Sequence, residues 1–177
     1  NGLHHENELV EALRQAVPGL ASVVINSNRD RTNVALGQKC RTVFGSDTIE
    51  DTLCGLRFRL SPLSFYQVNR TQAERLYQLA ADYAGLTGQE LLLDLYCGAG
   101  TIGLSMAHKA RRLIGVEIIP EAVDNAKENA RLNGIENAEF FCGDAGEAAR
   151  MLAAQGERPD VVILDPPRKG CSEDLIR

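Results

Sequence analysis

The sequence has 177 residues, of which 44% are apolar and 24% charged, so it can bury a core, which excludes a disordered or fibrous chain. Three histidines, no tryptophan and 5% aromatic residues disfavour a histidine-rich metal site and an aromatic platform for stacking bases. The formal net charge of −5 excludes a module that binds nucleic acid through bulk positive charge. The sequence has no apolar run of membrane-spanning length and no signal peptide, so we expect a cytoplasmic protein without a membrane partner.

The five cysteines are scattered, and none forms a C-x-x-C pair or has a histidine at ligand spacing. This pattern disfavours a structural zinc site, and we expect no metal. Free thiols in a reducing compartment are the expected state of these residues. They are Cys40, Cys54, Cys97, Cys142 and Cys171.

The first 60 residues are β-rich. A short helical stretch is expected at 8–16, and the loops between the later apolar runs contain Asn, Asp, Ser and Gly. Such runs are typical of a meander of antiparallel strands. The expected strands cover residues 21–25, 32–36, 41–44, 48–53 and 56–60.

From residue 61 onward, buried strands alternate with helices, which predicts an α/β fold with a parallel sheet. A helix is expected at 71–84, capped by Asn69 or Thr71 and ended by Gly85; another begins at Pro120 and ends at Gly134. The expected strands cover residues 91–95, 113–116, 138–141 and 161–164.

The domain boundary is therefore expected between residues 60 and 61. Residues 1–60 would be part of a small β-rich domain, and residues 61–177 the first part of an α/β domain. An open α/β sheet usually continues after a fourth strand, and Asn1 is not a methionine, so we expect an internal piece of a longer protein.

A glycine loop follows the expected strand 91–95. Gly98, Gly100 and Gly103 fit G-x-G-x-x-G, a weak signal by itself, and glycines without a Cβ let the backbone turn sharply against a ligand. Glu117 ends the next strand, where a carboxylate can accept ribose hydroxyls. Together these residues predict a site for an adenosine-containing cofactor.

Asp94 decides between the candidate cofactors. A carboxylate at this strand end would repel the pyrophosphate of a dinucleotide, which disfavours a dehydrogenase. It suits S-adenosylmethionine, which has no phosphate and carries a cationic ammonium and a sulfonium. We therefore expect S-adenosylmethionine.

A second motif ends the expected strand 161–164. Asp165 is followed by Pro166 and Pro167, which hold a loop in one shape, and ligands of open α/β sheets bind at this edge. Arg168 and Lys169 form a basic pair that could contact substrate phosphates or lie in a solvated turn.

Four segments resemble the RNA uracil-5-methyltransferases, which make 5-methyluridine in ribosomal or transfer RNA with S-adenosylmethionine. The resemblance runs from about residue 23 to the last residue, and its first and last motifs are specific to the family, whereas most methyltransferases share the glycine loop. It implies a Rossmann-like class I methyltransferase core. The segments are SPLSFYQVN at 61–69, DLYCGAG at 94–100, GVE at 115–117 and DPPRKG at 165–170.

The resemblance also implies a set of cofactor-binding residues. Gln67 and Tyr96 would contact the cofactor, with Thr101 adding a contact. Glu117 would bind the ribose hydroxyls, Asp144 would lie by the adenine, and Asp165 would lie near the methionine end. For two of these residues a purely structural reading stays open: entry into a helix for Gln67 and a helix cap for Asp144.

The family's mechanism needs a nucleophilic Cys and a base, which the resemblance does not place within this chain. In the family a Cys thiolate adds to C6 of uracil, C5 takes the methyl group, and a base removes the C5 proton. Both catalytic groups follow the Asp-Pro-Pro segment and would fall beyond Arg177, so no catalytic residue is assigned here. Cys97 and Cys171 occupy family positions that are not the nucleophile.

Residues 31–34 and 49–51 resemble the bacterial ribosomal RNA members, which favours 23S rRNA over tRNA as the partner. Two other functions stay open. Asp165-Pro166-Pro167 could hold an amino nitrogen in an N-methyltransferase, or the chain could be a non-catalytic binding module, although a module would not need Glu117 and Gln67.

Overall fold

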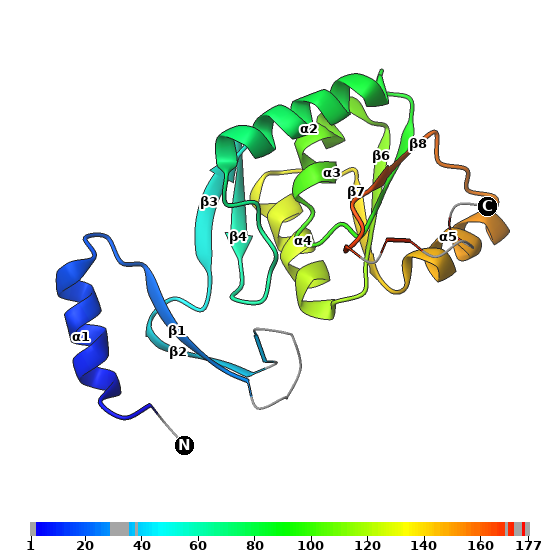
Figure 1. Ribbon diagram of the computed structural model, residues 1–177. Helices are drawn as coiled ribbons and strands as arrows, with labels where there is room; N and C mark the ends of the chain where they lie inside the picture. The colour runs from blue at the N-terminus through cyan, green and yellow to red at the C-terminus, as the bar shows by residue number, and fades with distance from the viewer. Residues whose placement is uncertain (1–2, 29–35, 38, 169, 172–174, 176–177) are drawn as a thin grey trace. The chain divides into compact units, whose positions relative to one another are not determined.

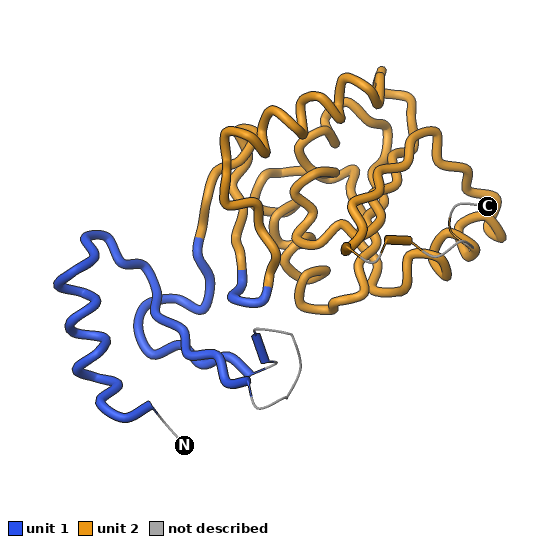
Figure 2. Tube along the Cα trace, in the orientation of Figure 1, with its two compact units in different colours: residues 1–49, 61–63 blue, residues 50–60, 64–177 orange. Residues whose placement is uncertain are grey.

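The computed structural model describes residues 3–28, 36–37, 39–168, 170–171 and 175. The chain divides into two compact units, shown in different colours in Figure 2. The first comprises Asn1–Ile49 with Ser61–Leu63, and the second comprises Glu50–Leu60 with Ser64–Arg177. The helices and strands are labelled in Figure 1.

The first unit contains helix α1 (Glu6–Ala16) and the antiparallel strands β1 (Ser22–Ser27) and β2 (Lys39–Gly45). The Arg14 guanidinium lies 5.1 Å from the centre of the Phe44 ring, so the helix packs on the hairpin partly through a cation–π contact. The expected helix and two of the expected strands are confirmed. Most of the strand expected at 32–36 lies outside the described residues.

The hairpin of β3 (Ile49–Leu53) and β4 (Leu56–Leu60) lies in the second unit, apart from Ile49. Its turn, Cys54-Gly55, has positive φ at both residues, as a two-residue hairpin turn requires. Leu53 and Phe58 are fully buried and belong to the same hydrophobic core as the central parallel strand. This packing explains why the division of the chain differs from the boundary expected at residue 60.

The four later strands form one parallel sheet in the order β7-β6-β5-β8. The expected α/β fold is confirmed. Each of the four strands expected after residue 61 is present, and its ends agree within one residue. The alternation of strands and helices along the sequence does not predict the order of the strands in the sheet. In that order β5 lies between β6 and β8. The strands are β5 (Leu91–Leu95), β6 (Arg112–Glu117), β7 (Ala138–Cys142) and β8 (Val161–Leu164).

Helices cover both faces of this sheet (Figure 1). One face carries α2 (Arg70–Ala84), α3 (Thr101–Met106), the 3₁₀ turn Ala107–Lys109 and α4 (Pro120–Leu132), which share a core with the β3–β4 hairpin. The other face carries α5 (Ala145–Ala154). Layers of this kind bring the carboxyl ends of the parallel strands to one edge, where the loops are free to bind a ligand.

The helix boundaries follow the expected signals. Asn69 caps α2, since its Oδ1 accepts a hydrogen bond from the N–H of Gln72, and Gly85 ends that helix in the left-handed conformation. Pro120 is the first residue of α4. No helix in the described part of the chain combines the length and the apolar character needed to cross a membrane.

Candidate cofactor site

A cavity of about 690 Å³ lies at the carboxyl edge of the parallel sheet. It is lined by the segment after β4, the glycine loop after β5 and the residues that follow β6, β7 and β8. The structure brings all five predicted residues into its wall, although they come from five different segments. They are Gln67, Tyr96, Glu117, Asp144 and Asp165.

The glycine loop forms one wall of the cavity. Tyr96 has a φ of 65°, which is rare for a residue with a side chain, and Gly98 and Gly100 also have positive φ. A Cβ on Gly100 would lie 3.1 to 3.3 Å from Leu104, Ala126 and other side chains, so the loop packs tightly behind the cavity. The backbone there can turn away from β5 and into α3 within a few residues.

Glu117 is fixed by the backbone around it. Its Oε2 accepts a hydrogen bond of 3.1 Å from the N–H of Gly98, and its Oε1 accepts one of 2.9 Å from the N–H of Ile119. The carboxylate therefore keeps one position at the end of β6 and ties the glycine loop to it. Each oxygen has a second lone pair, so the group can still accept hydroxyl hydrogens.

Asp94 does not line the cavity, which corrects the role that we inferred from the sequence. The residue is completely buried, and its Oδ2 accepts a hydrogen bond of 2.9 Å from the N–H of Gly103. Burial raises the pKa of Asp94 to about 7, and the charges of Asp165 and Glu117 act in the same direction. Asp94 lies beneath the glycine loop, behind the wall rather than at it, and its burial disfavours the charged form.

Asp144 is both a helix cap and a residue of the cavity wall. It caps α5, because its Oδ1 accepts hydrogen bonds of 2.9 and 3.1 Å from the N–H groups of Gly146 and Glu147. It also lines the cavity. The cap fixes the side chain at the rim, after β7.

Asp165 is exposed at the end of β8, with Pro166, Pro167 and Arg168 continuing the wall. The N–H of Gly170 donates to the carbonyl of Pro167 across 2.8 Å and closes a turn. Of the basic pair expected here, Arg168 lines the cavity, while Lys169 lies outside the described residues.

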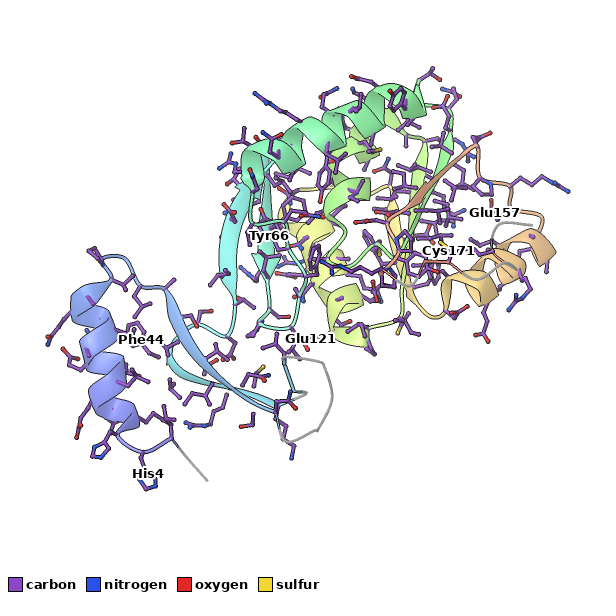
Figure 3. The ribbon with its side chains drawn as sticks, in the orientation of Figure 1. His4, Phe44, Tyr66, Glu121, Glu157 and Cys171 are labelled. Atoms are coloured by element: carbon purple, nitrogen blue, oxygen red, sulfur yellow. The ribbon has the colours of Figure 1, made fainter. Side chains whose placement is uncertain are left out.

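The segment between β4 and α2 supplies the wall that contains Gln67. Tyr66, which is labelled in Figure 3, belongs to the same segment. Phe65 is 75% exposed although it lines the cavity. The Tyr66 hydroxyl donates to Oδ2 of Asp51 across 3.1 Å, and burial together with this contact raises the pKa of Tyr66. The hydrogen bond anchors this segment to the β3–β4 hairpin.

Tyr77 is a buried residue of α2 that also lines the cavity. Its hydroxyl lies 3.1 Å from Oγ1 of Thr101, and both residues line the cavity. Helical periodicity shows that a side chain points inward but not that the core opens into a cavity at that point. Phe65 and Tyr66 could have been found, because they stand inside the SPLSFYQVN segment.

The cysteines near the cavity differ in their surroundings. Burial raises the pKa of the Cys97 thiol, so the group stays protonated and is a poor nucleophile. Cys171 is half-buried, and it lies beside Tyr96, whose pKa is raised by burial and by that thiol. In the described part of the chain, no three His, Cys, Asp or Glu side chains are grouped to hold a metal ion.

The residues present fit a cationic adenosine cofactor. Glu117 and Asp165 in the wall provide negative charge for an ammonium and a sulfonium, and among the described residues Arg168 is the basic side chain in the lining. The fixed Glu117 carboxylate suits a pair of ribose hydroxyls. A pyrophosphate would meet these carboxylates at close range.

Comparison with known proteins gives relatives in sequence. Residues 87–172 match a family model described as a methyltransferase domain. A protein of Clostridium acetobutylicum described as an uncharacterized RNA methyltransferase is 47% identical over 172 residues, 97% of this chain and 37% of the relative. One of Caldanaerobacter subterraneus, described in the same way, is 48% identical over 97% of this chain and 38% of its own length. The chain thus spans less than two-fifths of these relatives.

Solved structures share the fold. The tRNA (uracil-54, C5)-methyltransferase of Pyrococcus abyssi, in complex with S-adenosyl-L-homocysteine, superposes with a TM-score of 0.72 at 27% identity over 92% of this chain and 39% of that protein. A SAM-dependent methyltransferase of Agrobacterium tumefaciens gives 0.59 at 22% identity over 73% of this chain and 44% of its own, a likeness of fold alone. The parallel sheet, the cavity at its carboxyl edge and these likenesses show a Rossmann-like fold of the kind found in methyltransferases, with residues 87–172 matching the methyltransferase-domain model.

Proposed function

We propose that this chain is the cofactor-binding part of an enzyme that transfers a methyl group from S-adenosylmethionine to C5 of a uridine in RNA. One observation carries the proposal. The segments 61–69 and 165–170, which resemble the uracil-5-methyltransferases most specifically, contribute residues to the same cavity as the glycine loop. The relatives named RNA methyltransferases, and the likeness to a tRNA (uracil-54, C5)-methyltransferase, support an RNA substrate.

We further propose that Gln67, Tyr96, Glu117, Asp144 and Asp165 bind the cofactor. Glu117 would accept the ribose hydroxyls, since two backbone N–H groups already hold its carboxylate in place. Asp144 would lie by the adenine, and Asp165 by the methionine end. When bound, the cofactor would supply an electrophilic methyl group, in the cavity that Phe65 and Arg168 also line.

The preferred substrate is 23S rRNA, because residues 31–34 and 49–51 resemble the bacterial ribosomal RNA members. A tRNA substrate is the alternative, and the reaction would take place in the cytoplasm. The β-rich residues 1–60 would belong to the central domain of such an enzyme. Arg168 would meet a substrate phosphate.

We expect the 177-residue chain to bind the cofactor without methylating RNA. The Cys97 thiol is buried and protonated, and Cys171 occupies a family position that is not the nucleophile. Addition to C6 of uracil needs a thiolate, which these two residues are not expected to supply. Methyl transfer to RNA by the chain alone would contradict this expectation.

The test uses the complete product of the source gene, S-adenosylmethionine with a labelled methyl group, and separate 23S rRNA and tRNA transcripts. The RNA is digested to nucleosides, which are separated and identified by mass. Labelled 5-methyluridine in 23S rRNA is the expected result. Label in tRNA alone would show that tRNA is the substrate instead.

The same digest tests a second function, methylation of an amino nitrogen. Asp165, exposed at the cavity and followed by Pro166 and Pro167, is the observation that favours it. Label in an N-methylated adenosine or cytidine, with none in 5-methyluridine, would replace the first proposal by this one. Heat of binding with NAD but not with S-adenosylmethionine would overturn both.

A further inference from the structure

Asn125 and Asn129 of α4 and its C-cap residue, Asn133, form a row along one face of the helix, because they are spaced by four residues. Each of these side chains bonds to a residue outside the helix. Asn125 Nδ2 donates to Oγ of Ser64 across 2.8 Å, and Asn133 bonds to both the N–H and the carbonyl of Arg57, at 2.9 and 2.6 Å. We call this row the asparagine ladder.

Asn129, the middle residue of the ladder, is completely buried and uses both ends of its amide. Its Oδ1 accepts a hydrogen bond of 2.7 Å from the N–H of Arg59 in β4. Its Nδ2 donates to the carbonyl of Ala99 in the glycine loop across 3.1 Å. A buried amide with both ends paired fixes the distance between its partners, because leaving either end unpaired is costly.

The contact with Ala99 fixes the glycine loop from behind. Ala99 lines the cavity and stands between Gly98 and Gly100, both of which have positive φ and few conformational restraints of their own. On the cavity side, the N–H of Gly98 is held by Glu117. The loop is therefore held by a carboxylate on one side and by the Asn129 amide on the other.

The ladder also reaches the wall that contains Gln67. Ser64, which Asn125 contacts, directly precedes Phe65 and lies three residues before Gln67, and both of these line that wall. One face of α4 thus contacts the backbone of β4, the start of the Gln67 segment and the glycine loop. Two walls of the cavity that are distant in sequence therefore contact the same row of side chains.

We propose that Asn129 is a positioning residue for the cofactor, which sets the glycine loop in its binding conformation. Asn125, on the same face of α4, contacts the start of the Gln67 segment, whereas Asn133 contacts β4. The inference rests on the cofactor assigned above and does not depend on which RNA is methylated. Asn129 does not touch the cavity itself, since Ala99 lies between. Loss of the hydrogen bond between Asn129 and Ala99 should weaken cofactor binding by more than the loss of folding stability accounts for.

The matched variants are Asn129→Asp and Asn133→Asp. Each keeps an oxygen to accept from β4 and removes the amide donor, but only the first affects a contact with the glycine loop. Asn129→Ser is a smaller change, in case the first variant does not fold. Two readouts are taken: calorimetric titration with S-adenosyl-L-homocysteine, and hydrogen exchange of peptides spanning residues 98–103 in the cofactor-free protein.

We expect both Asn129 variants to raise the Kd at least tenfold and to speed exchange of residues 98–103. Asn133→Asp should lower the Tm while it leaves the Kd within twofold of the parent value. A lowered Tm in the Asn129 variants with unchanged Kd and unchanged exchange would overturn the proposal. Failure of the parent protein to bind would instead refute the cofactor assignment, and the exchange measurement would still decide the role of Asn129.

Discussion

The carboxylate of Asp94 and the backbone N–H of Gly103 are joined by a hydrogen bond of 2.9 Å inside the protein. This bond links the end of the central strand β5 to the first turn of α3, with the glycine loop between them. The contact is so close that a Cβ on Gly103 would lie 2.7 Å from Oδ2 of Asp94 and 2.9 Å from Leu113. The third glycine of the G-x-G-x-x-G pattern is thus required by packing.

The substitution Gly103→Ala tests this packing. Alanine favours a helix over glycine by about 1 kcal/mol, but the buried contact should outweigh that gain and destabilise the protein by about 1 to 3 kcal/mol. Urea unfolding gives the difference. Gly143→Ala is the control, because a Cβ there meets no atom within 4 Å; equal stability of the two variants would contradict the argument.

The raised pKa of Asp94 predicts a pH dependence of stability. Its pKa is about 7 in the folded protein and about 3.9 in an unfolded chain. Between these values the folded state binds a proton that the unfolded state does not. Stability should therefore fall as the pH rises from about 4 to about 7, by a few kcal/mol at most, and this contribution should be level outside that window.

The variant Asp94→Asn removes the titrating group and keeps an oxygen that can accept from Gly103. Its free energy of unfolding in urea should fall less than that of the parent between pH 5 and pH 8. All other groups titrate in both proteins, so the difference between the two slopes reports on Asp94. Equal slopes would show that the carboxyl does not titrate in this range.

The sequence predicts the second unit well, because its elements carry strong local signals. Buried apolar runs mark the strands, and Asn69, Gly85 and Pro120 mark helix ends through capping and backbone geometry that depend on a few neighbouring residues. Tyr96, Glu117, Asp144 and Asp165 follow or end strands of one parallel sheet, which must bring them to the same edge, whereas Gln67 is found through its motif. The order of the strands and the burial of the β3–β4 hairpin depend on packing between residues distant in sequence, so local patterns do not predict them.

Asp94 and Asn129 show where the reading of the site from sequence fails. The sequence places Asp94 at a strand end, but the direction of its side chain is set by the N–H of Gly103, which faces it across the turn. Asn129 stands on α4 among buried alanines, which carry the helical period. Polar residues with partners on other elements follow no period, so hydrophobic patterning does not reveal them.

Glu90 predicts a pH dependence of the opposite sign. Its carboxylate accepts hydrogen bonds from the hydroxyl and the N–H of Thr87 and from the N–H groups of Gly88 and Gln89. The bonds to Thr87 are the main cause that lowers the pKa of Glu90 to about 2. The stabilisation should be complete above about pH 4.5 and be lost as the pH falls towards 2.

The variant Glu90→Gln tests this expectation through thermal unfolding. It should lower the Tm at pH 7, where the parent carboxylate is ionised, and the difference should shrink as the pH falls to 2.5. Glu136→Gln serves as the control, because the Glu136 carboxylate accepts, from the residues that the structure describes, no hydrogen bonds of the kind that Glu90 accepts. A Tm difference that does not depend on pH would mean that the charge of Glu90 contributes nothing.

The fixed carboxylate of Glu117 gives the most direct test of the site. The variant Glu117→Ala removes the acceptor for Gly98 and Ile119 and the expected partner of the ribose, so the Kd for S-adenosyl-L-homocysteine should rise at least tenfold. Glu117→Gln keeps one acceptor oxygen but turns an NH₂ group towards a backbone N–H, and should be intermediate. Glu121→Gln, on the first turn of α4 and outside the cavity wall, should bind as the parent does. Calorimetry ranks the four proteins, and an alanine variant that binds as tightly as the parent would remove Glu117 from the cofactor site.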